Sequence, residues 1–166
     1  MAKTYEPIAT TTLSSAQSSV TFSSISGSYT DLILVCSPAQ TTQGQGDLQF
    51  RFNSDTGGNY SFTRLIGSGS AASSSRATNT SFINFEYYGY PSDTLGNSVQ
   101  IVQIMNYSNT TTYKTALGRP NSAETGLEAS VGLWRSTAAI TSITGFMSAG
   151  TLKAGSTFSL YGIKSA

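Results

Sequence analysis

The chain has 166 residues, and its 9 lysine and arginine residues nearly balance its 8 aspartate and glutamate residues, for a formal net charge of +1. Charged residues make up 10% of the chain, against about 25% in an average globular protein. They are scattered, which argues against the basic clusters that nucleic acids and anionic lipid surfaces require. We therefore expect neither nucleic acid nor a membrane as a partner.

The length fits a single domain covering residues 1–166, with enough chain to bury a core without disulfides or a structural metal. The N-terminus has no apolar segment typical of a secretory signal, and no apolar run approaches the roughly 20 residues of a membrane helix. These features predict a protein made in the cytoplasm. An aromatic content of 11% and periodic aliphatic residues argue against disorder.

Apolar residues recur with a period of two along the chain, which predicts β-strands. The first clear candidate is the continuous apolar run DLILVCS, residues 31–37. It predicts a central strand covered on both faces, with Cys36 as a buried thiol. The next is DLQFRFN, residues 47–53, in which every second residue is apolar.

The segment NSDTGGN, residues 53–59, has the composition of a hairpin loop. It would join the preceding strand to YSFTRLI, residues 60–66, with Gly57 and Gly58 supplying positive φ angles. The serine-rich residues 67–80 predict a long flexible connection.

Four further segments alternate apolar and polar residues: 81–87, 98–105, 127–134 and 157–163. In the third of them the residues expected to face the core are Leu127, Ala129, Val131 and Leu133. In the last segment Phe158 and Leu160 are expected to face inward, so that the chain ends on a buried strand.

About ten strand candidates, spaced by turns, predict an all-β fold, namely an antiparallel two-sheet β-sandwich that is jelly-roll-like. No helix of normal length is expected, and residues 119–126 would form one helical turn at most.

Enzymatic chemistry has little support. The chain lacks histidine, which removes the usual serine or cysteine triad, and a single cysteine excludes a thiolate zinc site. Glu86 and Glu128 could serve as a glycosidase pair, but two solvated strand carboxylates are the favoured interpretation. Asp55 and Asp93 could each bind Ca²⁺, although aspartate in a turn normally caps its own backbone. We predict no enzyme, no catalytic residue, no cofactor and no metal site.

Aromatic residues beside turns are more informative, because tyrosine, tryptophan and arginine anchor protein interfaces. The candidate interface residues are Tyr5, Tyr87, Tyr88, Tyr90, Trp134 and Arg135. Tyrosine and tryptophan can also stack on sugar rings, and some of these side chains could instead close the ends of the sandwich.

The opening YEPIATTTLSSAQSSVTFSSISGSYTDLILV, the segment LQFRFNSDTGGNYS, the pattern W…AAITSI and the closing FSLYGI together resemble small structural proteins of tailed bacteriophages. The similarity covers nearly the whole chain. It implies a virion protein without catalytic residues, most like the head-decoration (cement) proteins, which bind the outer surface of the head shell. The implied partners are the major capsid protein and further copies of the chain, with a homotrimer expected at the three-fold points of the shell. Low charge would also limit repulsion between crowded copies. The alternative is a tail-fibre or spike adsorption module that binds host surface glycan.

Overall fold

The computed structural model describes residues 4–42, 44, 46–87 and 90–164, and the described part contains twelve strands and no helix. The strands are β1 (Tyr5–Thr12), β2 (Ser19–Phe22), β3 (Asp31–Ser37), β4 (Leu48–Phe52), β5 (Tyr60–Gly67), β6 (Ala72–Thr80), β7 (Ile83–Asn84), β8 (Ser98–Met105), β9 (Lys114–Ser122), β10 (Gly126–Trp134), β11 (Ile143–Met147) and β12 (Thr157–Ile163). Within the described ranges, no helix has the length and apolar character that crossing a lipid bilayer takes.

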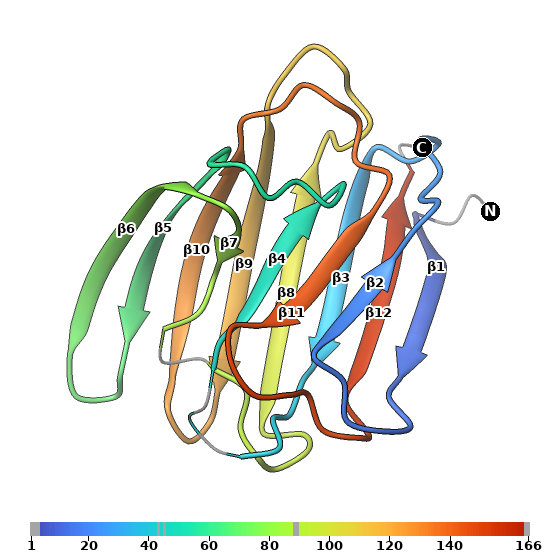
Figure 1. Cartoon of the computed structure of the whole chain (residues 1–166). Coiled ribbons are helices and arrows are strands. Elements are labelled where there is room, and N and C mark those ends of the chain that lie inside the picture. The colour runs from blue at the N-terminus through green and yellow to red at the C-terminus, as the bar shows by residue number, and fades with distance from the viewer. Residues whose placement is uncertain (1–3, 43, 45, 88–89, 165–166) are drawn as a thin grey trace.

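The strands form two antiparallel sheets that lie face to face (Figure 1). The larger sheet has eight strands in the order β1-β12-β3-β8-β9-β10-β5-β6, and the smaller has four in the order β2-β11-β4-β7. The predicted all-β, two-sheet sandwich is therefore confirmed, with twelve strands in place of about ten. The jelly-roll order of the strands stays a prediction.

The inner faces of the two sheets share one apolar core. Phe50 and Phe52 of β4 point inward, as the alternation in DLQFRFN predicts, and so does Ile104 of β8. Phe158 and Leu160 are also buried, because β12 lies between β1 and β3 within the larger sheet. The apolar end of the chain is thus an interior strand, as predicted.

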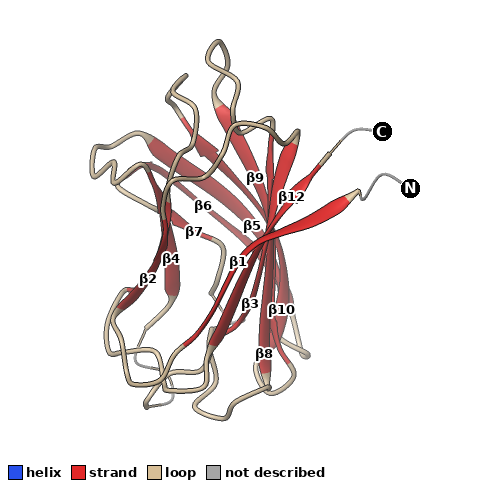
Figure 2. Ribbon diagram, turned by 90° about the vertical axis from the view of Figure 1, so that its right-hand side faces the viewer, coloured by secondary structure: helices blue, strands red, loops and turns tan. Residues whose placement is uncertain are grey.

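The prediction that β3 is covered on both faces is wrong. Leu34 and Cys36 are buried on the inner face, whereas Ile33 and Val35 on the outer face are only half-buried. The reason is visible in Figure 2, where the smaller sheet lies on one side of the larger sheet and no second layer covers the other side. The prediction of a buried Cys36 thiol is confirmed.

The predicted inward face of β10 is also wrong. The residues that point inward are Glu128, Ser130, Gly132 and Trp134, while all four predicted inward residues, Leu127, Ala129, Val131 and Leu133, lie on the outward phase. The reason is close packing of β7 over the larger sheet. A Cβ atom on Gly132 would lie 2.6 Å from Ile83 Cγ2, so only glycine lets this segment approach.

Residues 53–59 do not form a hairpin loop, because β4 belongs to the smaller sheet and β5 to the larger one. The positive φ angles fall on Asn53 and Ser54, at 51° and 57°, rather than on Gly57 and Gly58. Asn53 Oδ1 accepts hydrogen bonds from the backbone amides that precede β11, which stabilises this left-handed bend at the crossing between sheets.

Residues 67–80 are not a flexible connection. Most of them form β6, which pairs with β5 along its whole length through a tight turn at Gly69. β6 is an edge strand with little core contact and needs few apolar residues, so its serine-rich sequence lacks the alternating pattern that predicts a strand. Residues 119–122 likewise continue β9 in place of a helical turn.

Candidate functional site

The outer face of the larger sheet carries most of the exposed large apolar side chains in the described part of the chain. They are Leu65, Met105, Leu117, Leu127 and Val131, with exposed fractions from 40% to 65%. On a sheet face that is exposed to solvent, such positions are normally polar. A group of exposed apolar side chains on one face is therefore a candidate interaction surface.

The register of the strands makes part of this surface continuous. Leu65 of β5 lies directly opposite Ala129 of β10, and Val131 lies opposite Leu117 of β9. Leu127 follows on the same face of β10, two residues from Ala129. Neighbouring strands are about 4.8 Å apart, so the opposed side chains lie side by side and the five residues form one continuous strip across β5, β10 and β9. We call Leu65, Leu117, Leu127, Ala129 and Val131 the apolar face.

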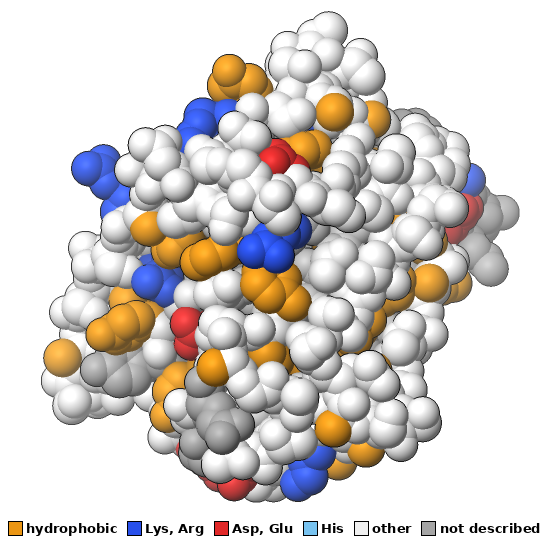
Figure 3. Space-filling view, in the orientation of Figure 1, with side chains coloured by type: hydrophobic (Ala, Val, Ile, Leu, Met, Phe, Trp, Pro, Cys, Tyr) orange, Lys and Arg blue, Asp and Glu red, His pale blue; other side chains and the backbone are white. Residues whose placement is uncertain are grey.

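Three shallow hollows follow the apolar face. One of about 370 Å³ lies among Leu65, Leu117 and Val131, and one of about 410 Å³ lies beside it, where Val131 meets Thr78 and Thr115. The face is therefore ridged, which suits the side chains of a partner better than a flat sheet does. The opposite side of the molecule, in Figure 3, is mostly uncharged polar surface with scattered apolar and charged groups.

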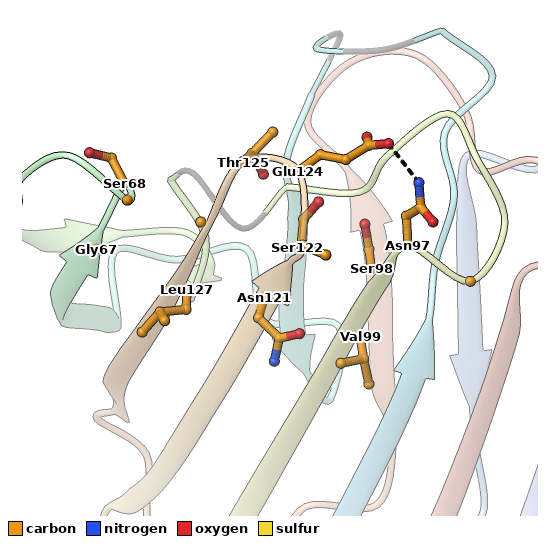
Figure 4. A pocket seen from close by; sticks show the side chains of 14 residues that line it. Gly67, Ser68, Asn97, Ser98, Val99, Asn121, Ser122, Glu124, Thr125 and Leu127 are labelled. Carbon is orange, nitrogen blue, oxygen red and sulfur yellow. Dashed lines mark hydrogen bonds between the residues drawn. The ribbon is translucent and has the colours of Figure 1, made fainter.

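The third and largest hollow, of about 740 Å³, lies where β8, β9 and β10 meet their turns (Figure 4). Val99, Asn121 and Leu127 line it from three neighbouring strands. Above them, Asn97 Nδ2 donates a hydrogen bond of 2.8 Å to the exposed carboxylate of Glu124. This end of the face offers amides, hydroxyls and one fixed carboxylate beside an exposed leucine.

Among the described members of the sequence-predicted tyrosine set, Tyr5 lies apart from Tyr87. Tyr5 and Tyr87 are 56% and 55% exposed, and Tyr90 is half-buried. Tyr5 lies in the edge strand β1, whereas the Tyr87 ring lies 5.4 Å from the guanidinium of Arg64, near the other edge of the same sheet. Tyr88 lies outside the described residues.

Trp134 is a core residue, which corrects its prediction as an interface anchor. It is 2% exposed, stacks on Tyr60 at 6.2 Å between ring centroids, and meets Phe52 edge-on at 5.7 Å. Its Nε1 donates a 2.7 Å hydrogen bond to Asp55 Oδ2. The inward phase of β10 buries the ring, so no partner can reach it. We call Phe52, Tyr60 and Trp134 the aromatic cluster.

Arg135 is held within the chain. Its Nη2 donates to the backbone oxygen of Gly58 at 2.7 Å and to Asn79 Oδ1 at 3.0 Å, and its Nη1 donates to Ser61 Oγ at 3.3 Å. These bonds tie the end of β10 to β5 and β6, so the guanidinium has a structural task.

Asp55 behaves as turn aspartates normally do, by capping its own loop. Its Oδ1 accepts from the backbone amide of Gly57, and its Oδ2 accepts from Asn59 as well as Trp134. Partial burial acts to raise the pKa of Asp55, but the hydrogen bonds from Trp134, Asn59 and Gly57 outweigh it and lower that pKa. Among the described residues no three histidine, cysteine, aspartate or glutamate side chains gather to hold a metal.

Glu86 and Glu128 are buried, so the prediction that they are solvated strand carboxylates is wrong. They are 1% and 4% exposed, because Glu128 lies on the inward phase of β10 and the chain after β7 folds against it. Glu86 Oε2 accepts a 2.7 Å hydrogen bond from the backbone amide of Leu48, whereas its Oε1 has no hydrogen-bond partner among the described residues. Burial, and then the neighbouring carboxylates of Asp47 and Glu128, raise the pKa of Glu86 well above its usual value.

Arg64 lies among these carboxylates, a position that the sequence did not signal. Its Nη1 donates to the backbone oxygen of Glu86, and its Nε donates to Ser75 Oγ at 3.1 Å. Asp47 accepts a 2.8 Å hydrogen bond from Asn84 Nδ2. We call Asp47, Arg64, Glu86 and Glu128 the polar cluster. Arg64 and Glu128 of the larger sheet bond the backbone of residues 86 and 87, and Glu86 bonds the backbone of β4, so the cluster fastens this segment between the two sheets.

No protein-family model matches the chain, and no curated protein matches it. The assignment of a functional site consequently rests on the geometry of the described residues, and the apolar face is the strongest candidate among them. The alternating pattern predicts Leu127, Ala129 and Val131 of this face to lie in the core, because an exposed leucine and a buried one look alike in such a pattern.

Proposed function

We propose that the chain is a structural protein of a bacteriophage virion, acting as a decoration (cement) protein on the outer surface of the head shell. The observation that carries the proposal is the apolar face, an uncovered surface of a stiff antiparallel sheet. Such a surface suits permanent attachment to another protein, since burying it removes aliphatic area from water. The phage-like segments of the sequence supply the class of assembly.

In this proposal the protein is no enzyme and takes no cofactor. Its partners are the major capsid protein and further copies of itself, with a trimer at the local three-fold points of the shell. A chain in which only 10% of residues are charged places little like-charge repulsion between neighbouring copies. The two-sheet core, with Phe158 and Leu160 closing it, supplies the stiffness that a reinforcing element needs.

The test is to purify particles of the phage that encodes the chain and to compare its copy number with that of the major capsid protein. A stoichiometry close to that of the capsid protein, with cryo-EM density on the outer surface of the head, is the expected result. Density confined to the tail would reject a decoration role, and absence from the particle would reject a virion role.

A second candidate, an adsorption module that binds host glycan, is favoured by the hollow at the turns of β8, β9 and β10. Asn97, Asn121 and Glu124 there present the amide and carboxylate groups that pair with sugar hydroxyls. No aromatic side chain is among the lining residues, so the stacking that sugar sites commonly use is missing from that hollow. Binding to a glycan array, lost in Asn121→Ala, would favour this function over decoration.

A further inference from the structure

We infer that the apolar face, together with Arg76 and Arg119, docks on a protein surface of aliphatic residues flanked by carboxylates. The inference rests on the proposed function, in which that surface belongs to the head shell. It adds the docking side of the molecule and the chemistry of the partner.

The two arginines lie on the same side of the sheet as the apolar face. Arg76 of β6 is directly opposite Thr63 of β5, and that register continues through Val131 to Leu117. Arg119 is the next outward residue after Leu117 on β9. One guanidinium therefore lies beyond the face at the β6 edge, and the other lies towards the turn of β9 and β10.

Both arginines are exposed, and within the described ranges neither guanidinium has a hydrogen bond, an ion pair or a ring contact. The outward positions of strands β5, β6, β8, β9 and β10 contain no aspartate or glutamate. On the next strand, β3, the outward Asp31 already accepts a hydrogen bond from the backbone amide of Asn106. The surface is thus apolar in the middle and carries charge of one sign at its margin.

This charge pattern argues against a second copy of the chain as the occupant. A two-fold contact between two such faces would bring arginines near arginines without supplying carboxylates. Acidic groups elsewhere on the chain are engaged. The exposed Asp93 and Glu124 accept hydrogen bonds from Thr94 and Asn97, and the half-buried Glu6 accepts one from Lys164.

An arginine that loses water at an interface must be paired, since an unpaired buried charge is costly. A guanidinium presents a planar fork of donors that matches a carboxylate with two parallel hydrogen bonds. The partner therefore places carboxylates opposite Arg76 and Arg119, and aliphatic side chains opposite the hollows beside Leu65, Leu117 and Val131. Apolar contact supplies the affinity, and the charges fix the register.

The experiment adds purified full-length chain back to particles whose gene for this protein is deleted, and measures the bound fraction across a range of NaCl concentrations. The face variants are the double change Leu65→Thr with Leu117→Thr, which keeps β propensity, and Arg119→Glu. The matched controls lie off the face: Leu95→Thr, at a leucine 47% exposed, and Lys153→Glu, at an exposed cation. Circular dichroism confirms that each variant is folded.

We expect each face variant to weaken binding by about tenfold or more, and the controls to bind like the wild type. Wild-type binding should weaken moderately with salt, and the salt dependence should shrink in Arg119→Glu. If wild type and face variants bind equally well, the docking face is wrong while the decoration role stands. If the wild-type chain binds no part of the particle, the proposed function and this inference both fall.

A second measurement separates self-association from partner binding. Light scattering gives the mass of the free chain and of the Leu65→Thr, Leu117→Thr variant in solution. Equal masses are expected, because any oligomer forms through other surfaces. An oligomer that is lost in the variant would show that the face joins copies of the chain, which overturns the acidic partner.

Discussion

The two ends of the sandwich interior are built by the same two strands, β5 and β10, yet they carry opposite chemistry. At one end Trp134 of β10 lies opposite Tyr60 of β5 and their rings stack. At the other end, inward positions of the same strands are taken by Glu128 and Arg64. The pleat decides which residues face inward, but the covering segment decides which side chains are tolerated there.

The two ends also differ in how completely their polar atoms are bonded. In the aromatic cluster the Tyr60 hydroxyl donates to the backbone oxygen of Phe52 and accepts from its amide, while Trp134 donates to Asp55. Burial raises the pKa of Tyr60 to about 12, so this end keeps its charge state at neutral pH. In the polar cluster no described residue donates a hydrogen bond to Glu86 Oε1. The first end should supply stability, and the second should make stability depend on pH.

The largest expected effect is at the aromatic end. Trp134→Ala removes a fully packed ring and leaves Tyr60 and Phe52 facing a cavity, so the free energy of unfolding should fall by about 3–5 kcal/mol. Urea denaturation followed by circular dichroism measures the change. Leu127→Ala, at a residue 65% exposed on the same strand, is the control and should change stability by less than about 0.5 kcal/mol. Similar losses in both variants would contradict the assignment of Trp134 to the core.

The next effect is at the polar end and depends on pH. The pKa of Glu86 is raised in the folded chain, so folding retains a proton that the unfolded chain releases. Its contribution to stability is complete below the unfolded pKa of about 4.3 and is lost as the pH rises from there towards the folded pKa. Asp47, whose pKa is also raised by burial, acts in the same direction.

Glu86→Gln should therefore flatten the decline in stability between pH 5 and pH 8. It should raise stability by about 1–3 kcal/mol at pH 8, because no buried charge must then be accommodated, with little change at pH 5. Urea midpoints across that range test this, with Glu124→Gln as a control at an exposed carboxylate. A decline that is equally steep in Glu86→Gln would show that Glu86 is not the group responsible.

The sequence predicts the inward phase correctly in β4, whose apolar residues all lie on that phase. It also does so in β12, where Phe158 and Leu160 share the inward phase. It fails for β10, where the outward phase is the more apolar one. The phase of β10 that faces the core is set by Gly132, whose lack of a side chain lets Ile83 pack against it, and by the large Trp134 ring, which is buried. Such fit between distant segments has no local signature, and the same is true of a loop that changes sheets in place of closing a hairpin.

For the candidate site the difficulty is similar. The rule that apolar residues face inward would assign Leu65, Leu117 and Leu127 to the core, but they lie on the uncovered side of the larger sheet. The prediction for the carboxylates was wrong in the opposite sense. Glu86 and Glu128 lie at positions that the sequence pattern assigns to solvent, but other segments of the chain cover them. A signal was present in Gly118, since a Cβ atom there would lie 2.4 Å from Phe85 Cδ1. A glycine inside an otherwise regular strand indicates that another segment approaches closely.

The smallest effect returns to the aromatic end and tests whether its polar atoms matter. The pKa of Asp55 is lowered in the folded chain, so its contribution is present above the unfolded pKa of about 3.9 and is lost as the pH falls through the folded value. Asp55→Asn keeps the shape but weakens the charge-assisted bonds from Trp134 and Asn59. It should cost about 0.5–1.5 kcal/mol at pH 7 and less at pH 3. The stability from Asp55 is lost as the pH falls, whereas the stability from Glu86 is lost as the pH rises. At pH 7 the urea midpoint should therefore be lower than wild type in Asp55→Asn and higher than wild type in Glu86→Gln. If Asp55→Asn instead gained stability at pH 7, the bond to Trp134 would not be what completes the aromatic cluster.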